Sequence, residues 1–267
     1  MHAIVRPVSP SMERCELTHI ARSCIDVTRA QAQHRGYVQT LQLLGCHIVE
    51  LPAESEMPDA VFVEDTAVVL EEVAVLTRPG AKSRQSEVAS IAKALAPFRP
   101  CFFIESPGTL DGGDLLRIGR ELYVGRSERS NASGIAQLTR ILQRFGYQVT
   151  PVTIRNCLHL KTAVTQVGPS TLLINDAWVD RKVWAGMNFV AVDPEEPFAA
   201  NALFLAETVI HPASAVRTRD HLAASGIRVI SVDISEFEKA EGGVTCCSVI
   251  FDALPALWRT TTMFGHE

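Results

Sequence analysis

Residues 135–152 read IAQLTRILQRFGYQVTPV, and this stretch contains the unit that decides the fold. Its first part has apolar residues at the three- and four-residue spacing of a helix with one buried face. Gly146 follows, and glycine can adopt the left-handed conformation that ends a helix without steric cost. Beyond Gly146, apolar and polar residues alternate with the period of two that is typical of a strand. The stretch therefore predicts a helix, a glycine stop and a strand.

The same unit recurs along the chain, so one structural element is repeated. Three further copies, each with a glycine, are YVQTLQLLGCHIVELP (37–52), KVWAGMNFVAVD (182–193) and DHLAASGIRVISVD (220–233). A fifth copy, EVASIAKALAPFRPCFFIES (87–106), has Arg99-Pro100 in place of the glycine. We expect five helix-bearing units.

After each unit, a polar residue leads into a second apolar strand. These residues, spaced 42 to 48 positions apart, are Asp65, Asp111, His159, Asn201 and Cys246. A near-constant period indicates a repeat architecture, because each unit needs neighbours to cover its apolar face. The pattern predicts an α/β fold of five units around an axis, with the five polar residues at the centre. An ordinary parallel sheet stays open as an alternative, although no phosphate-binding glycine loop supports it. Without a linker or low-complexity segment, residues 1–267 are expected to form a single domain.

Composition excludes several classes of partner. The chain has 267 residues, of which 47% are hydrophobic and 21% charged, and its net charge is −5. No basic footprint points to nucleic acid, and no apolar run approaches the roughly 20 residues that span a membrane. The N-terminal residues lack the apolar segment of a secretory signal. Seven cysteines, an odd number without a CxxC pair, fit free thiols in a reducing compartment and argue against structural zinc. We expect a cytoplasmic protein.

The central residues contain the parts of a nucleophilic site. The stretch GGVTCCSVI (242–250) supplies Cys246 as a thiolate, His159 can move protons, and Asp111 can orient the histidine. Since strand neighbours alternate, Cys247 is expected on the opposite face. Each residue also has a structural interpretation: two small core cysteines, a satisfied core histidine, and a turn former before Gly112-Gly113. Because the three residues take equivalent positions in the repeat, the catalytic interpretation is favoured over the structural ones.

Other charged residues predict the kind of ligand. The segment PDAVFVED contributes Asp59, Glu64 and Asp65, while Arg84 and Arg129 lie in GAKSR and SERSN. Carboxylates recognise a guanidinium by planar charge-assisted hydrogen bonds, and arginines hold a carboxylate in the same way. A ligand with a guanidinium at one end and a carboxylate at the other is an arginine derivative. Ordinary surface ion pairing is the alternative.

These residues stand in strings that resemble those of dimethylarginine dimethylaminohydrolases, members of the guanidine-modifying superfamily. The matching strings, in order and over nearly the whole chain, are PDAVFVEDTAVV, TRPGAKSR, LDGGDLL, YVGRSERSN, LHLKTAV and EGGVTCCS. The resemblance implies a five-fold pseudosymmetric α/β propeller, the pentein fold, of five ββαβ-type repeats with the active site on the central axis.

The resemblance also implies roles for individual residues. Cys246 is similar to the family's nucleophile, His159 to its general acid and base, and Asp111 to the carboxylate partner of that histidine. The substrate contacts that it implies are Glu64 and Asp65 on the guanidinium, Asp59 on the α-amino end, Arg84 and Arg129 on the α-carboxylate, Leu17 in a lid, and Ala240 through its backbone.

The implied reaction is hydrolysis of Nω-methylated arginine to citrulline and methylamine or dimethylamine, with a small molecule as the partner and no metal or organic cofactor. A thiolate beside a histidine can still bind zinc, which would inhibit. A small deiminase acting on arginine or another guanidine is the nearest alternative, although such enzymes usually carry a helical insertion. A non-catalytic propeller that binds protein is a further alternative, but it has no reason to keep Cys246, His159 and Asp111. The oligomeric state, including a homodimer, stays open.

Overall fold

The strands of the computed structural model, which describes residues 1–252, are grouped in five separate three-stranded sheets. The sheets are β15 (Val249–Phe251), β1 (His2–Val5) and β2 (His47–Glu50); β3 (Ala67–Val69), β4 (Ala74–Leu76) and β5 (Cys101–Phe103); β6 (Leu115–Ile118), β7 (Glu121–Arg126) and β8 (Gln148–Thr153); β9 (Val164–Gly168), β10 (Thr171–Ile174) and β11 (Asn188–Ala191); and β12 (Leu203–Leu205), β13 (Thr208–Pro212) and β14 (Val229–Val232).

Every sheet has the same topology. Its middle strand pairs antiparallel with one neighbour and parallel with the other, as β4 does with β3 and β5. A helix connects the two parallel strands, since parallel neighbours need a crossover. These connections contain α1 (Val27–Leu43), α2 (Val88–Leu95), α3 (Ala132–Leu142), the 3-10 helix η6 (Arg181–Trp184) and α5 (Val216–Ala224). The five-unit repeat predicted from the sequence is confirmed.

The predicted glycine stops also occur in the structure. Gly45, Gly146, Gly186 and Gly226 all have positive φ, between 76° and 91°. The expectation of a helix in every unit is wrong for the fourth. There the segment between Asp180 and Gly186 forms only the 3-10 helix η6, because it is too short to hold an α-helix of ordinary length.

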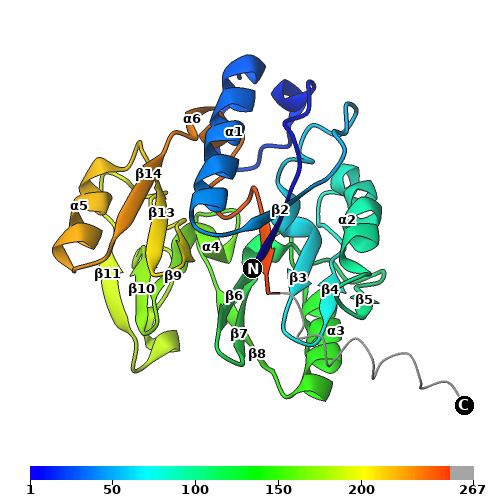
Figure 1. The fold of residues 1–267 in the computed structure, drawn as a ribbon. Coiled ribbons are helices and arrows are strands. Elements are labelled where there is room, and N and C mark those ends of the chain that lie inside the picture. Colours follow the sequence, from blue (N-terminus) through cyan, green and yellow to red (C-terminus); the bar gives the residue numbers. More distant parts are fainter. Residues whose placement is uncertain (253–267) are drawn as a thin grey trace, which may run out of the picture.

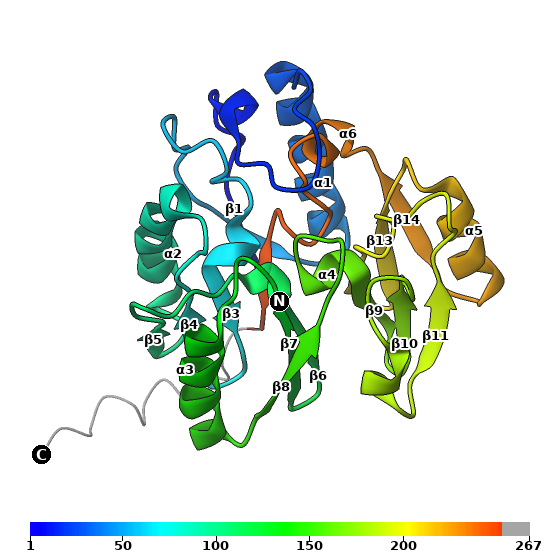
Figure 2. The same ribbon diagram turned by 180° about the vertical axis from the view of Figure 1, so that it is seen from behind.

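Five apolar clusters join each sheet to the next. One cluster, for example, contains Leu205 and Ile210 of the fifth sheet together with Ala3 and Val5 of the first. The other four clusters link the first sheet to the second, the second to the third, the third to the fourth, and the fourth to the fifth. The sheets thus form a closed ring, seen from the two sides in Figures 1 and 2, with the connecting helices α1, α2, α3 and α5 outside it. This is the predicted α/β propeller.

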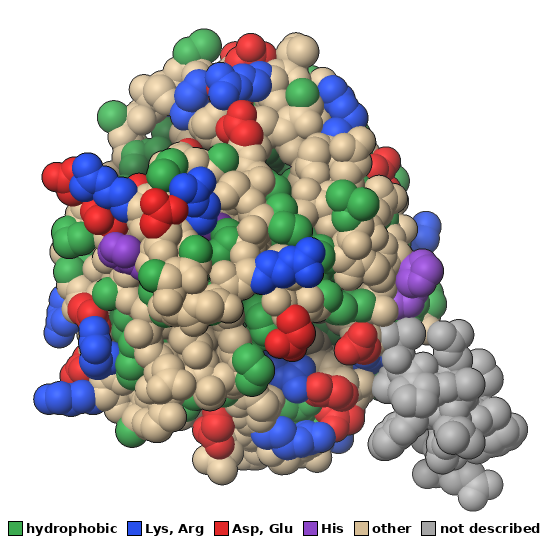
Figure 3. All heavy atoms as spheres, turned by 60° about the vertical axis from the view of Figure 1, so that its left-hand side comes forward, with side chains coloured by type: hydrophobic (Ala, Val, Ile, Leu, Met, Phe, Trp, Pro, Cys, Tyr) green, Lys and Arg blue, Asp and Glu red, His purple; other side chains and the backbone are tan. Residues whose placement is uncertain are grey.

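The charged side chains on one face of the molecule are mixed in sign. On the face drawn in Figure 3, lysine and arginine side chains are interspersed with acidic ones, and no patch of one sign forms there. None of the helices between residues 1 and 252 is long and apolar enough to cross a membrane.

Candidate active site

The five polar residues of the repeat lie near one another at the centre of the ring. They do not begin strands directly, as the sequence suggested, because short turns intervene. Asp65 lies within the 3-10 helix η2 (Val63–Thr66), and Asp111 and His159 precede η4 (Gly112–Asp114) and α4 (Leu160–Ala163). Asn201 precedes β12, and its amide bonds Thr245, the neighbour of Cys246. Turns at the strand starts direct these side chains toward the axis.

Cys246 and Cys247 lie in a turn and not in a strand, so the prediction that they are alternating neighbours of one strand is wrong. The backbone N–H of Cys246 donates to the carbonyl oxygen of Gly243, which closes the turn at 3.2 Å. The Cys246 side chain nevertheless borders the central cavity, whereas Cys247 is 2% exposed and packs in an apolar cluster. The Gly243 N–H also donates to the Cys246 Sγ, at 3.3 Å. A Cβ on Gly243 would lie 2.4 Å from Asn201 Oδ1, so only glycine allows this approach.

Burial and nearby carboxylates disfavour the Cys246 thiolate. Burial, and then the charges of Glu64 and Asp65, raise the pKa of the Cys246 thiol to about 12. Without a ligand, Cys246 is therefore a neutral thiol at neutral pH. A cation between it and these carboxylates would lower that pKa.

His159 lies between two carboxylates and is 6% exposed. Its Nε2 lies 3.0 Å from Asp111 Oδ2 and 4.0 Å from Asp65 Oδ1. Burial disfavours the charged ring, but the Asp65 charge and the Asp111 hydrogen bond outweigh it and raise the pKa of His159 to about 9. A Cβ on Gly113 would lie 2.7 Å from Nδ1, so this glycine lets the loop approach the ring. At neutral pH the ring is an imidazolium and can donate a proton.

Asp65 remains charged despite its burial. Burial alone would raise its pKa, yet the charges of His159 and Arg84 hold it at about 2. The donor atoms of Asp65, Asp111 and His159 lie within 4.8 Å of one another, a spacing that could hold a metal ion. Because a metal ligand must be a neutral imidazole, a metal ion would have to displace the proton from the ring, and its binding would weaken as the pH falls. The imidazolium itself is the cation in this cluster.

Sequence reasoning missed Asp114, the second aspartate of LDGGD. Its Oδ1 accepts the N–H of Leu160, next to His159, at 3.0 Å. Its Oδ2 accepts the hydroxyls of Ser127 and Ser130, and burial raises its pKa to about 6. Asp114 thus fixes the start of α4 and with it the His159 backbone. The only sequence signal was a second acidic residue in the same motif.

Lys161 was also missed, although it follows His159 by two residues. Its Nζ lies 2.5 Å from Glu64 Oε1, and the Thr245 hydroxyl donates to Glu64 Oε2 at 2.6 Å. The ion pair separates the central cavity from a second one on the other side of the ring, since both residues border each cavity. Glu64 is therefore held rigidly at the base of the site.

A smaller cavity of about 20 Å³ adjoins Cys246 and His159. Besides these two, its lining includes five of the residues expected to bind substrate: Asp59, Asp65, Arg84, Arg129 and Ala240. The Arg129 Nη2 donates to the Thr18 hydroxyl at 2.8 Å, and Arg129 has no ion-pair partner within the described residues. It is the cation most available to an anionic ligand.

Arg84 is less available than the sequence suggested. Its guanidinium is paired with Asp65, at 2.6 Å, and with Glu87, at 3.0 Å, and it also donates to the Phe62 carbonyl oxygen. Of its five N–H groups, one on Nη1 is left for a ligand. The buried carboxylates beside it account for the difference.

The segment from Glu16 to Ile20, here called the strap, covers the smaller cavity. Its Glu16 N–H donates to Asp59, at 3.1 and 3.2 Å to the two oxygens, and the N–H groups of Thr18, His19 and Ile20 all donate to the Glu241 carboxylate. Leu17, the expected lid residue, belongs to the strap, but its side chain packs against an apolar cluster. Glu16, His19 and Ile20 border the cavities instead.

The arrangement suits attack on a cationic carbon. Three carboxylates, Glu64, Asp65 and Asp111, surround a thiol and a protonated imidazole at the meeting point of two cavities. A planar cation would be held by the carboxylates, activate the thiol and receive a proton from the ring.

Comparisons with known proteins give the same picture. The family model described as arginine deiminase matches residues 54–196. An N(G),N(G)-dimethylarginine dimethylaminohydrolase of Pseudomonas aeruginosa is 36% identical over 94% of this chain and 99% of its own length. The enzyme of the same name from Streptomyces coelicolor is 40% identical over 92% of this chain and 95% of its own length.

A solved structure has the same overall fold as this chain. The Pseudomonas aeruginosa protein, as a cysteine-to-serine mutant complexed with citrulline, superposes with a TM-score of 0.89 at 36% identity. The match covers 94% of this chain and 98% of that one.

Proposed function

Because the chain belongs to the dimethylarginine dimethylaminohydrolase family, we propose that it hydrolyses Nω-methylated arginine to citrulline and dimethylamine or methylamine. The observation that carries this proposal is the junction at Cys246 and His159. On one side lie groups for an amino-acid end, and at the junction itself lie carboxylates for a guanidinium.

We assign the substrate contacts by charge. The α-carboxylate is bound by Arg129 and by the remaining N–H of Arg84, while Asp59 accepts the α-ammonium group. Burial raises the pKa of Asp59, so a bound ammonium would favour its charged form. Glu64 and Asp65 hold the guanidinium. Leu17 would act through the strap and Ala240 through its backbone on the wall of the smaller cavity.

In the proposed mechanism the substrate activates the nucleophile. Its guanidinium charge offsets the field of Glu64 and Asp65, so the Cys246 thiol loses its proton to solvent water when the substrate binds. The thiolate then attacks the guanidinium carbon, and His159 donates a proton to the departing amine. The neutral ring next takes a proton from water, whose oxygen displaces Cys246 to give citrulline. Asp111 keeps the ring in place through its 3.0 Å contact with Nε2.

No cofactor is needed for these steps, because thiol, imidazole and water supply every bond and proton. We further propose one catalytic domain over residues 1–267, of which 253–267 lie outside the described residues. The five apolar clusters that link each sheet to the next support this. A cytoplasmic location is supported by seven cysteines that are all free. A methylated arginine is the proposed partner; neither nucleic acid nor a membrane is expected, and a homodimer stays open.

Turnover tests the proposal directly. Purified protein is incubated with asymmetric dimethylarginine, monomethylarginine or arginine, and citrulline and the released amine are both quantified. We expect citrulline and dimethylamine in equal amounts from dimethylarginine. Ammonia from arginine at equal or higher kcat/KM would instead identify a small deiminase.

A further inference from the structure

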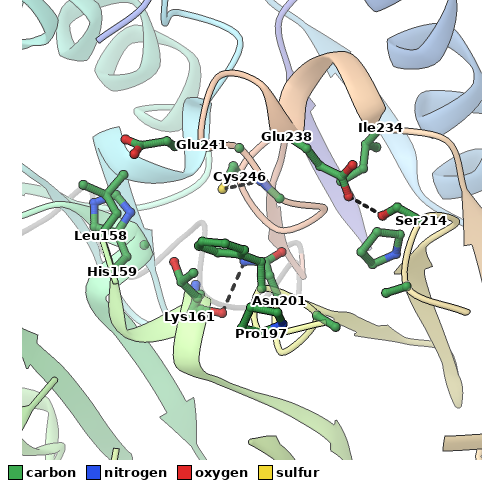
Figure 4. A pocket seen from close by; sticks show the side chains of 18 of the residues that line it. Leu158, His159, Lys161, Pro197, Asn201, Ser214, Ile234, Glu238, Glu241 and Cys246 are labelled. Carbon is green, nitrogen blue, oxygen red and sulfur yellow. Dashed lines mark hydrogen bonds between the residues drawn. The ribbon is translucent and has the colours of Figure 1, made fainter. Parts of the chain in front are cut away.

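The central cavity, here called the larger cavity, lies on the far side of Cys246 from the smaller one. It is much larger than the proposed reaction needs. Its volume is about 360 Å³, which lies in the range of sites that bury a drug-sized ligand. Figure 4 shows it extending from His159 and Leu158, past Cys246, to Glu238 and Ser214. Two methyl groups on a guanidinium would fill only the part beside Cys246.

The proposed orientation of the substrate points its leaving nitrogen into this larger cavity, and the inference rests on that proposed function. Cys246 and His159 border both cavities, whereas Asp59, Arg84 and Arg129 border only the smaller one. With the amino-acid end directed toward Asp59, Arg84 and Arg129, the substituted nitrogen faces the larger cavity. The larger cavity is therefore placed to receive whatever that nitrogen carries.

Most of the wall is suited to an alkyl chain. It is formed largely by the apolar side chains of Pro197, Phe198, Ala199, Pro212, Ala215 and Ile234. Phe198 is 53% exposed and packs edge-on against Trp178 with ring centroids 5.2 Å apart. An extended methylene chain would contact these groups without losing hydrogen bonds.

Glu238 lies at the end of the cavity and differs from the other acidic residues that line it. Its Oε1 accepts the Ser214 hydroxyl at 2.5 Å, and no cation or N–H group pairs with its carboxylate within residues 1–252. The neighbouring acids are satisfied: Glu195 lies 2.8 Å from Arg217 Nη1, and Glu196 accepts the backbone N–H groups of Arg217 and Thr218. Glu241 accepts three N–H groups of the strap. An unneutralised, half-buried carboxylate at the end of an apolar cavity favours a cationic ligand group.

We propose that the larger cavity is a subsite for the leaving group and accepts Nω-substituents longer than methyl, with preference for an alkyl chain that ends in an ammonium group. The substrates are Nω-(aminoalkyl)arginines. Water adds its oxygen to the guanidinium carbon, the bond from that carbon to the substituted nitrogen breaks, and citrulline and a protonated diamine leave. No oxidant or further reactant is involved.

Two substrates of matched length test the subsite: Nω-(3-aminopropyl)-L-arginine and Nω-butyl-L-arginine. Citrulline and the released amine are measured by mass spectrometry beside dimethylarginine. We expect release of 1,3-diaminopropane with kcat/KM within about tenfold of that for dimethylarginine, and above that for the butyl compound, because a charge-assisted hydrogen bond forms with Glu238.

The variant Glu238→Gln keeps the size of the side chain and removes its charge. It should lower the ratio of kcat/KM for the aminopropyl compound over the butyl compound by about tenfold. The matched control is Glu195→Gln, since that carboxylate already pairs with Arg217 and should leave the ratio as in the wild type. An unchanged ratio in Glu238→Gln would overturn the inference.

Failure of the inference and failure of the proposed function give different results. Turnover of dimethylarginine without release of 1,3-diaminopropane overturns the subsite alone. Turnover of neither substrate overturns both proposals. Release of 1,3-diaminopropane without turnover of dimethylarginine supports the subsite and overturns the methylarginine preference.

Discussion

The two cavities that meet at Cys246 differ in size and in the state of their charges. The smaller one, about 20 Å³, has Asp59 and Arg84 already bonded to the protein and a strap across it. The larger one, about 360 Å³, is mostly apolar and contains an unneutralised Glu238. In the proposed orientation of the substrate, fixed polar contacts recognise the amino-acid end, while the leaving group meets a mostly apolar wall with one unneutralised carboxylate.

The largest effect is expected at the junction itself. Cys246→Ser should lower citrulline formation by a factor of about 10⁴ or more, because the hydroxyl is a far weaker nucleophile than the thiolate. Cys247→Ser should retain most activity, since Cys247 packs in an apolar cluster away from both cavities. Steady-state assays on folded variants decide between them, and equal losses would contradict the assignment.

His159 should control the pH dependence. Its pKa in the ligand-free protein is raised to about 9, and the amine can leave only when the ring is protonated, so kcat/KM should fall as the pH rises through that value. His159→Gly should lower kcat by about 10²- to 10⁴-fold and abolish the alkaline limb of the profile. A wild-type profile that stays flat to pH 10 would exclude His159 as the acid. Circular dichroism at each pH controls for unfolding.

The two arginines should separate stability from binding. Arg84→Ala leaves Asp65 and Glu87 buried without their cation, so the free energy of unfolding should fall by about 3–5 kcal/mol. Arg129→Ala breaks no ion pair in the part of the chain described and should chiefly raise the KM for dimethylarginine, with little change in kcat. Both variants are measured by denaturant unfolding and by steady-state kinetics, so that each variant serves as the control for the other. An unchanged KM in Arg129→Ala would show that the carboxylate clamp lies elsewhere.

The smallest effect concerns the methyl groups. Each is worth about 0.8 kcal/mol when fully buried, so dimethylarginine should exceed arginine by roughly fifteenfold in kcat/KM from this source. A larger preference would require that arginine binds misaligned with Cys246. Measurement of all three substrates under one condition decides, and a preference for arginine would contradict the accommodating character of the larger cavity.

Much of the ring could be predicted from local sequence. Glycines such as Gly146 mark helix ends because the required positive φ is a local property, and the near-constant spacing of the polar residues gave the number of units. The strings around Cys246, His159 and Asp111 identified the central cluster before its geometry was known. Local signals suffice where a residue's role is set by its own neighbours in the chain.

Long-range contacts were not predictable in this way. Lys161 meets Glu64 across 97 positions, and Glu241 binds the strap across more than 220. Neither residue stands out locally, because a charged residue in a loop is usually solvated. The pairing of Arg84 with Glu87 was within reach at a separation of three residues, yet only burial shows that it withdraws Arg84 from a ligand. Cavity shape likewise arises only when five sheets have assembled.

The strand pairing in the first sheet affects when the fold can be completed during synthesis on the ribosome. Strand β1 has the parallel partner β2 early in the chain, but its antiparallel partner β15 is the last strand described, with His2 opposite Phe251. Cys246 precedes β15 by only a few residues, so the proposed nucleophile arrives at the axis together with the strand that closes the ring. A nascent chain that lacks this segment exposes the open edge of β1 but contains no nucleophile. Ring closure and completion of the proposed active site thus depend on the same segment, and a chain that ends before it should not hydrolyse methylated arginine.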